Sequence, residues 1–261
     1  SSISLSMARE LAKTRRVLYV NHPYSLKDAI SGLLSGDSVL KLRLPAILRG
    51  RNFYSTLDSI PDNFVFVQPP LTLPINWLPV GWIYDRLQQL NNRIILRSIR
   101  RAIKEYRFYN YVYINCYDPF FAGFLPENME AQCCIYHCID DISQNAYTAR
   151  HGLKLEQEAC RNADLTFVTS TNLKRLKEPF ARRIVTYFNA ADVSVFQKVL
   201  QERYPKPTEL AGRTGQVIGF IGNLDDLRID YPLLKKIALA YPDKTLLLVG
   251  PVNSREPAAI G

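Results

Sequence analysis

Long apolar runs and the common nucleotide-binding loops are what this sequence lacks. No stretch of about 18 apolar residues occurs, so no membrane-spanning helix is expected, and Pro74, Pro79 and Gly81 interrupt the apolar segment 69–83. The first ten residues lack the charged block and apolar core of a secretory signal. No Walker loop, G-x-S-x-G or G-x-G-x-x-G occurs, so the usual sequence signals of P-loop, hydrolase and dinucleotide enzymes are missing.

Cysteine is sparse and irregularly placed. The five cysteines, Cys116, Cys133, Cys134, Cys138 and Cys160, are an odd number without a regular spacing, so a reduced, cytoplasmic environment is expected. Cys133, Cys134, His137 and Cys138 suggest a zinc site, but successive residues of a strand point to opposite faces and no second ligand pair follows. We interpret these cysteines as small buried thiols and expect neither a metal nor a cofactor.

Acidic residues are scarce in the first part of the chain. Residues 1–110 hold 16 Lys and Arg against 7 Asp and Glu, whereas residues 111–261 hold 17 of each kind. The net charge of +9 therefore lies entirely in the first 110 residues. Such an excess favours an anionic partner, and nucleic acid, acidic lipid and phosphorylated small molecules all qualify.

Short apolar strands alternate with helices along the sequence. Strands are expected at 16–21, 63–70, 109–115, 133–140, 164–170, 183–189, 217–223 and 245–251, and helices at 4–14, 84–107, 153–161, 171–177 and 231–240. This alternation is typical of α/β folds with parallel sheets. The polar stretch 205–215 is expected to link a first domain, 1–204, to a second, 216–261. Because the second stretch holds only two strands and a helix, we expect a part of a longer two-domain protein.

The segment FNAADVSVF (188–196) carries the sharpest local signal. Its Asn189, Asp192 and Phe196 match the N-G-V-D-x-x-x-F element at the domain crossover of GT-B-type glycosyltransferases, and Ala190 replaces the usual glycine. The alternative is a tight turn in which the Asn and Asp side chains bind nearby backbone.

Two flanking segments extend this resemblance. Residues 159–173 are similar to the family's A-D-x-V-x-x-x-S-x-x-L element, and residues 217–252 are similar to the opening of its nucleotide-sugar domain. The chain thus resembles bacterial glycosyltransferases of the large retaining group that builds teichuronic acids and other surface polysaccharides. Within the first 110 residues the resemblance is confined to 7–20.

The resemblance implies a GT-B-type α/β fold with two Rossmann-like parallel-sheet domains, the second only partly present. It also implies transfer of a sugar, with retention and without a metal, from a nucleoside-diphosphate donor to a saccharide or lipid-linked acceptor. Its donor-binding positions fall at Gly222, Asn223 and Arg228, where many relatives carry Gly, Arg and Lys. Arg228 can still hold a phosphate, but Asn223 brings no charge. A solvated loop cation is the alternative for Arg228.

His137, Asp140 and Asp141 are the best acid/base cluster of the sequence. They lie at the end of the strand expected at 133–140, where α/β folds bind ligands, and the resemblance implies that this place faces the acceptor and the transferred sugar. An Asp there can orient an acceptor hydroxyl or balance the positive charge of an oxocarbenium-like state. The alternative is that Asp140 or Asp141 caps a helix.

The excess positive charge gathers on one expected helix. Arg93, Arg97, Arg100, Lys104 and Arg107 fall within about 40° of one line along it, and Trp77 and Trp82 precede it. Basic side chains beside exposed Trp suit an anionic membrane surface, so we expect peripheral attachment to the inner face of the plasma membrane. One alternative is a solvated helix face with buried tryptophans. The other is a non-catalytic nucleic-acid-binding module that uses helix 93–107, but the sequence has no recognisable nucleic-acid-binding motif.

Overall fold

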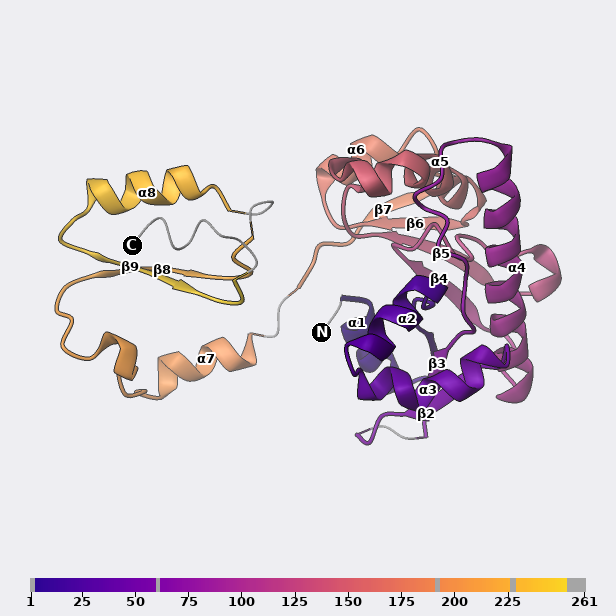
Figure 1. Ribbon diagram of the computed structural model, residues 1–261, viewed down its shortest axis with the longest axis horizontal. Helices are drawn as coiled ribbons and strands as arrows, with labels where there is room; N and C mark the ends of the chain where they lie inside the picture. Colours follow the sequence, from indigo (N-terminus) through magenta and orange to yellow (C-terminus); the bar gives the residue numbers. More distant parts are fainter. Residues whose placement is uncertain (1–2, 60–61, 191–192, 226–228, 253–261) are drawn as a thin grey trace. The chain divides into compact units, whose positions relative to one another are not determined.

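The computed structural model describes residues 3–59, 62–190, 193–225 and 229–252 (Figure 1). The chain forms two compact units, Ser1–Ala190 and Ala191–Gly261. This division precedes helix α7 (Ser194–Gln201), whereas the sequence placed the linker at 205–215. That stretch lies within the second unit, and it is locally structured: it includes the short helix η3 (Thr208–Leu210), and Lys206 donates to the carbonyl of Arg213 at 2.6 Å.

The first unit contains most of the helices and strands. Before the long helix lie α1 (Ile3–Ala12), β1 (Val17–Val20), α2 (Leu26–Leu34), α3 (Ser38–Leu48), β2 (Phe53–Thr56) and β3 (Phe64–Gln68). The long helix is α4 (Trp82–Glu105). After it come β4 (Val112–Cys116), η1 (Glu127–Met129), β5 (Cys133–Cys138), η2 (Ile142–Gln144), α5 (Ala146–Asn162), β6 (Leu165–Val168), α6 (Thr171–Lys177) and β7 (Ile184–Thr186).

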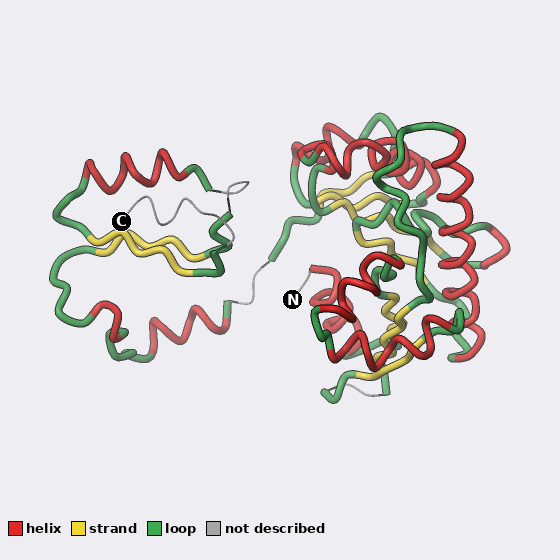
Figure 2. Tube along the Cα trace, viewed as in Figure 1, coloured by secondary structure: helices red, strands yellow, loops and turns green. Residues whose placement is uncertain are grey.

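These strands form two sheets (Figure 2). One has the order β1-β3-β2, with β1 parallel and β2 antiparallel to the central strand β3. The other has the order β4-β5-β6-β7, and all its neighbouring strands are parallel. The structure therefore confirms a mixed α/β fold with parallel sheets, which is compatible with a Rossmann-like arrangement.

Helix α4 packs against both sheets. Its Ala102 lies in a cluster with Val65 and Val67 of β3. Its Ile95 and Ile99 lie in another cluster that includes Val20 of β1 and Tyr113 of β4, together with residues of the 121–131 segment. Because one rigid helix contributes to both clusters, it fixes the carboxyl end of β1 relative to that of β4.

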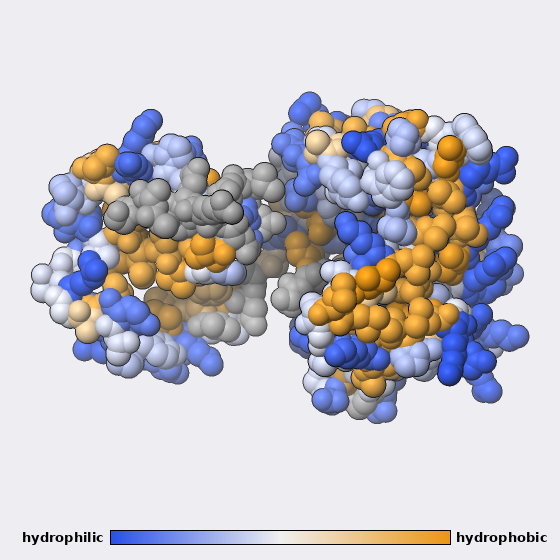
Figure 3. Space-filling view, in the orientation of Figure 1, coloured by the Kyte–Doolittle hydropathy of each residue, from blue (hydrophilic) through white to orange (hydrophobic). Residues whose placement is uncertain are grey.

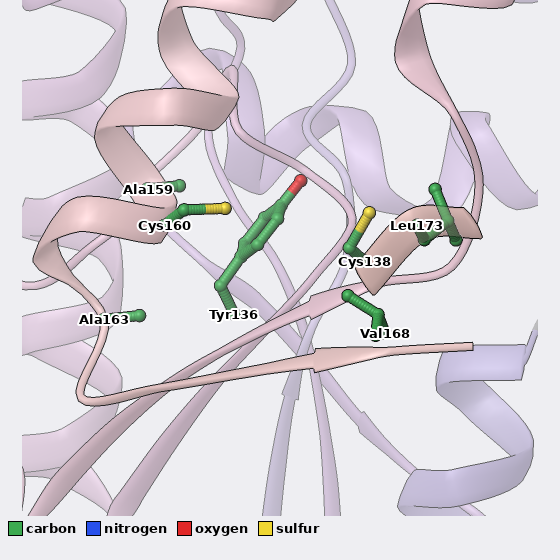
Figure 4. Close-up of a cluster of buried hydrophobic side chains, with 7 residues drawn as sticks. All are labelled: Tyr136, Cys138, Ala159, Cys160, Ala163, Val168 and Leu173. Carbon is green, nitrogen blue, oxygen red and sulfur yellow. The ribbon is translucent and has the colours of Figure 1, made fainter. Parts of the chain in front are cut away.

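Helices α5 and α6 cover one face of the four-stranded sheet. Tyr136 and Cys138 of β5 point into a cluster with Ala159, Cys160 and Leu173 (Figure 4). Side chains of the opposite face, such as Ile135 and Phe167, are half-buried. Strand alternation therefore separates His137 from the cluster that its two neighbours form.

Several elements of the first unit have no strong sequence signal. Helices α2 and α3 and the antiparallel strand β2 were not expected. Helix α2 begins at a capping box in which the Ser25 hydroxyl accepts from the Asp28 amide and the Asp28 carboxylate accepts from the Ser25 amide. Helix α3 contains Pro45 and presents apolar side chains to solvent, so its periodicity is weak.

The second unit contains α7 and a β-α-β segment. Strands β8 (Val217–Ile221) and β9 (Thr245–Val249) pair in parallel, and α8 (Tyr231–Ala240) connects them. Gly250 has φ +152°, and a Cβ there would lie 1.7 Å from the carbonyl oxygen of Gly222. Only glycine fits this close approach. In the described part of the chain, no helix has the length and apolar composition to cross a bilayer.

Candidate functional site

Four polar side chains of the first unit follow strands at their carboxyl ends. Neighbouring strands β4, β5, β6 and β7 run in one direction, so the segments that follow them lie at one edge. Asp118 follows β4, and Asp140 and Asp141 follow β5. His22 follows β1 and lies beside Asp118. α/β folds place their ligands at such an edge.

His22 and Asp118 form a hydrogen-bonded pair across this edge. The distance between His22 Nδ1 and Asp118 Oδ2 is 2.7 Å, and the imidazole meets the ring of Phe121 edge-on. Burial alone would lower the pKa of His22, but the hydrogen bond and charge of Asp118 outweigh it, and the pKa is raised. The His22 side chain is 65% exposed. A carboxylate on Nδ1 therefore orients the ring and leaves Nε2 for a ligand.

Buried amides hold both members of this pair. Gln68 at the end of β3 is fully buried and donates from Nε2 to the carbonyl of His22 at 3.2 Å. Its Oε1 accepts from Asn21 at 2.8 Å and from Arg43 at 3.0 Å. Asn115 accepts from the amide of Asp118 at 2.9 Å. These contacts fix the backbone on both sides of the histidine–carboxylate bond.

Asp140 and Asp141 take different roles. Asp141 caps η2, because its carboxylate accepts from the Ser143 amide at 3.0 Å, the Ser143 hydroxyl at 2.8 Å and Gln144 Nε2 at 3.1 Å. Burial alone would raise the pKa of Asp141. These hydrogen bonds lower the pKa by more than burial raises it, so the net shift is downward. Asp140 is exposed and accepts the Asp141 amide at 2.9 Å. Of the two, Asp140 is thus the carboxylate that a substrate can reach.

A buried ion pair supports the Asp140 loop. Lys177 Nζ lies 2.5 Å from Glu156 Oε2, and the side chains are 9% and 2% exposed. Glu156 Oε1 also accepts from the Tyr136 hydroxyl at 3.1 Å and from Cys138 Sγ at 3.4 Å. Cys138 Sγ lies 3.4 Å from the carbonyl oxygen of Asp140 as well. A satisfied buried network of this kind stabilises the strand end from which the loop departs.

Tyr117 precedes Asp118 and is influenced by the charge of Asp140. It lies between Cys116, the last residue of β4, and Asp118, and it has φ +55°, in the left-handed region that non-glycine residues rarely adopt. Burial raises the pKa of its hydroxyl, and the charge of Asp140 raises that pKa further. The charge of Asp140 therefore acts on the residue next to Asp118.

His137 has an unusual environment for a catalytic group. It is 3% exposed, and neither ring nitrogen has a hydrogen-bond partner among the described residues. Its ring meets Phe167 edge-on with centroids 6.4 Å apart. Burial lowers its pKa, which keeps the ring neutral near pH 7. In this conformation a substrate does not reach His137, although the sequence placed it with Asp140 and Asp141.

The donor positions lie in the second unit. Gly222 follows β8 and donates to the carbonyl of Val249 at 2.9 Å. Asn223 donates from Nδ2 to Asp225 Oδ2 at 2.7 Å. Asp230 caps α8 by accepting from the Leu233 amide at 2.9 Å. Asp225 and Asp230 thus place two carboxylates in the described part of the loop between β8 and α8. Arg228 lies outside the described residues.

The crossover motif is only partly described. Asn189 and Phe196 are exposed, and Phe196 lies in α7. Asp192 lies outside the described residues. Asn189 makes no hydrogen bond with another described residue, so this part of the structure does not show the backbone contacts of a tight turn.

The expected membrane surface is exposed. Trp77 and Trp82 are 66% and 75% exposed, so they are not buried tryptophans. Arg93, Arg97, Arg100 and Lys104 are exposed on α4, whereas Ile95, Ile99 and Ala102 are buried. Trp82, the first residue of α4, falls within about 40° of the same basic line. Arg107 differs, because α4 ends at Glu105 and Arg107 has φ +52°, outside the helix.

The loop that carries Trp77 is fixed to α5. Arg150 donates from Nη1 to the carbonyl of Trp77 at 3.1 Å, and His151 Nε2 lies 2.9 Å from the carbonyl oxygen of Leu78. The His151 ring stacks on Tyr84 of α4 with centroids 3.5 Å apart. Trp77 is therefore exposed on a loop whose backbone is fixed by hydrogen bonds to α5.

Sequence reasoning missed His22 and Asp118. Each follows a strand that the sequence did predict, at 16–21 and 109–115, and the chain has only three histidines. Inspection of the residues directly after each strand would have found both. Their pairing could not be found in this way, because 96 positions separate them.

Comparison with known proteins does not assign the chain to a family. A scan against protein-family models gives no match for this chain, and a search of the curated proteins gives none either. The proposals below therefore rest on the geometry of the site and on the resemblance described from the sequence motifs.

Proposed function

We propose that the chain is a GT-B-type glycosyltransferase that transfers a sugar from a nucleoside-diphosphate donor to a saccharide or lipid-linked acceptor in bacterial surface-polysaccharide synthesis. The observation that carries the proposal is the 2.7 Å contact between His22 and Asp118 at the carboxyl edge of the parallel strands. The motifs at 159–173, 188–196 and 217–252 supply the reaction class, and retention rests on the resemblance alone.

The proposed chemistry uses three side chains of the first unit. His22 Nε2 takes the proton of the acceptor hydroxyl as its oxygen bonds to the anomeric carbon of the sugar, on the same face from which the diphosphate departs, so that the configuration is retained. Asp118 holds the ring and stabilises the imidazolium that results. The nucleoside diphosphate leaves with the electrons of the broken bond, and the Asp140 carboxylate balances the positive charge that develops on the sugar. Asp141 is the positioning residue, since it caps η2 next to Asp140.

Donor binding is proposed for the second unit. The strand, glycine and helix at β8–α8 resemble a nucleotide-sugar domain, and we propose backbone contacts at Gly222 and Asn223 with charge supplied by Arg228. Asp225 and Asp230 oppose a diphosphate at the same loop. The contribution of Arg228 is accordingly central to donor binding in this proposal.

The reaction is tested by nucleoside-diphosphate release from UDP- and GDP-sugars in the presence of saccharide acceptors. We expect His22→Asn and Asp140→Asn each to lower the rate by about 10²-fold or more. Asp58→Asn is the matched control, because Asp58 is an exposed carboxylate of the same unit away from the carboxyl edge. Equal rates in all four proteins would refute the proposed roles.

A second proposal concerns location. Trp82 is exposed and aligned with basic residues of α4, and Trp77 is exposed on the preceding loop; both support peripheral attachment to an anionic membrane at the inner face of the plasma membrane. The exposed apolar side chains beside the arginines favour this partner over nucleic acid, which contacts basic and polar surface.

A further inference from the structure

An apolar groove lies between α4 and the α2–α3 segment of the first unit. It has a volume of about 400 Å³, which is within the range of ligand pockets. Leu26, Ile47, Leu48, Leu71 and Ile94 supply most of its apolar wall. None of the described residues that line it is acidic.

Two arginines stand on one side of this groove. Arg97 and Arg101 both line it, and both are exposed. They are four residues apart on α4, so their side chains leave the same helix face. Arg101 donates from Nη1 to the carbonyl of Gly50 at 3.0 Å. Among the described residues, no hydrogen bond or ion pair engages Arg97.

The groove is a fixed feature of the fold. The Ser98 hydroxyl donates to Asn52 Oδ1 at 2.7 Å, and Asn52 Nδ2 donates to the Ser98 carbonyl at 3.0 Å. Together with the contact between Arg101 and Gly50, these bonds fasten α4 to the segment that follows α3. The groove therefore does not depend on a ligand to hold its walls apart.

The surface around the groove is apolar. Ile30 and Leu34 of α2 are 61% and 84% exposed, and Leu42 and Leu48 of α3 are 68% and 61% exposed. In Figure 3 apolar surface extends over α2, α3 and the loop before α4, and hydrophilic side chains border it along α4. An apolar patch of this kind marks an interaction surface.

We propose that this groove binds one anionic phospholipid of the membrane, with an acyl chain along the apolar wall and the phosphate at Arg97 and Arg101. Charge complementarity selects the occupant: the guanidinium groups attract the phosphate of an anionic headgroup, and the apolar wall suits hydrocarbon. A free phosphate would leave the apolar wall unused. The inference rests on the proposed membrane attachment and adds a specific lipid site to it.

The test uses a short-chain phosphatidylglycerol below its critical micelle concentration, measured by titration calorimetry with the full chain. We expect it to bind, phosphatidylcholine of the same chain length to bind at least about tenfold more weakly, and inorganic phosphate not to bind measurably. Equal affinity for the two lipids, or binding of phosphate as strong as that of the anionic lipid, would overturn the proposal.

Matched variants locate the site. Arg97→Glu and Leu48→Asp should each weaken binding of the anionic lipid at least about tenfold. Leu153→Asp is the control for Leu48→Asp, since both are exposed leucines of helices and Leu153, on α5, lies outside the groove and its apolar surroundings. Arg182→Glu is the control for Arg97→Glu, as an exposed arginine outside the groove. If variants and controls bind alike, the groove is not the site.

Vesicle co-sedimentation separates the two proposals. If the chain binds phosphatidylglycerol vesicles but not the short-chain lipid, the groove proposal fails and the attachment stands. If neither binds, both fail. Circular dichroism of each variant confirms that a loss of binding is not a loss of fold.

Discussion

Lys177 Nζ lies 2.5 Å from Glu156 Oε2 in a place where both side chains are nearly excluded from solvent. The pair joins α5 to α6 beneath the end of β5. Glu156 also receives hydrogen bonds from Tyr136 and Cys138, so one carboxylate organises the buried side of the Asp140 loop. The ion pair therefore stabilises the fold, and it lies beneath the loop that carries Asp140 rather than among the residues proposed to react.

The first prediction concerns this pair. Lys177→Met leaves the Glu156 carboxylate buried without its charged partner, and it should lower the free energy of unfolding by about 3–5 kcal/mol. The double variant Glu156→Gln, Lys177→Met should recover much of that loss, because it removes both charges. Urea unfolding measures both. A loss below about 1 kcal/mol in the single variant, as for an exposed ion pair, would contradict the assignment.

The second prediction separates Asp141 from Asp140. Asp141→Ala removes the cap of η2 and should cost about 0.5–2 kcal/mol of stability, while Asp141→Asn should cost less. Because the folded pKa of Asp141 is lowered, its contribution is present above the ordinary Asp pKa and is lost as the pH falls through the folded value. Thermal unfolding at pH 7 and at acidic pH checks this. Asp140→Ala, which caps no helix, should leave stability unchanged.

The third prediction uses the fact that the chain has two tryptophans, Trp77 and Trp82, both exposed. The intrinsic Trp emission therefore reports only on the proposed membrane surface. Phosphatidylglycerol vesicles should shift it to shorter wavelength, and the shift should fall with added salt because the attraction is screened. Phosphatidylcholine vesicles are the control. An unchanged emission maximum with anionic vesicles would count against attachment.

The fourth prediction concerns Gly250. Its φ of +152° and the close approach to Gly222 leave no room for a Cβ, so Gly250→Ala should destabilise the second unit by on the order of 1–3 kcal/mol. Gly219→Ala is the matched control, because nothing lies within 4 Å of a Cβ there. Limited proteolysis of the second unit measures both. Equal protection of the two variants would mean that the glycine contact does not form.

Much of the fold follows from local patterns in the sequence. Strands such as β5 and helices such as α4 and α6 have strong apolar periodicity, and the structure places them within a few residues of the expected ranges. Helix α3 escapes such reasoning because several of its apolar side chains face solvent and Pro45 lies within it. Strand β2 is short and pairs antiparallel with β3, a contact between distant residues that no local pattern reveals.

The candidate site was less accessible to sequence reasoning. Adjacent residues such as Asp140 and Asp141 are visible as a pair, yet their division into an exposed carboxylate and a helix cap depends on where η2 begins. His137 is buried because its ring packs against Phe167 of β6. The residues next to His137 in the sequence do not indicate this burial. The contact between His22 and Asp118 requires β1 and β4 to end at one edge, and α4 brings about that arrangement through tertiary packing.

The pH dependence of kcat/KM for sugar transfer tests the central proposal most directly. If His22 is the base, kcat/KM rises with pH through the pKa of the free enzyme's imidazole, which Asp118 raises. Asp118→Asn removes the charge that raises this pKa, weakens the hydrogen bond to Nδ1 and leaves the burial that lowers the pKa. In this variant the acidic limb of the profile should move to lower pH, and the plateau should fall. An identical profile in both proteins would contradict this role of His22.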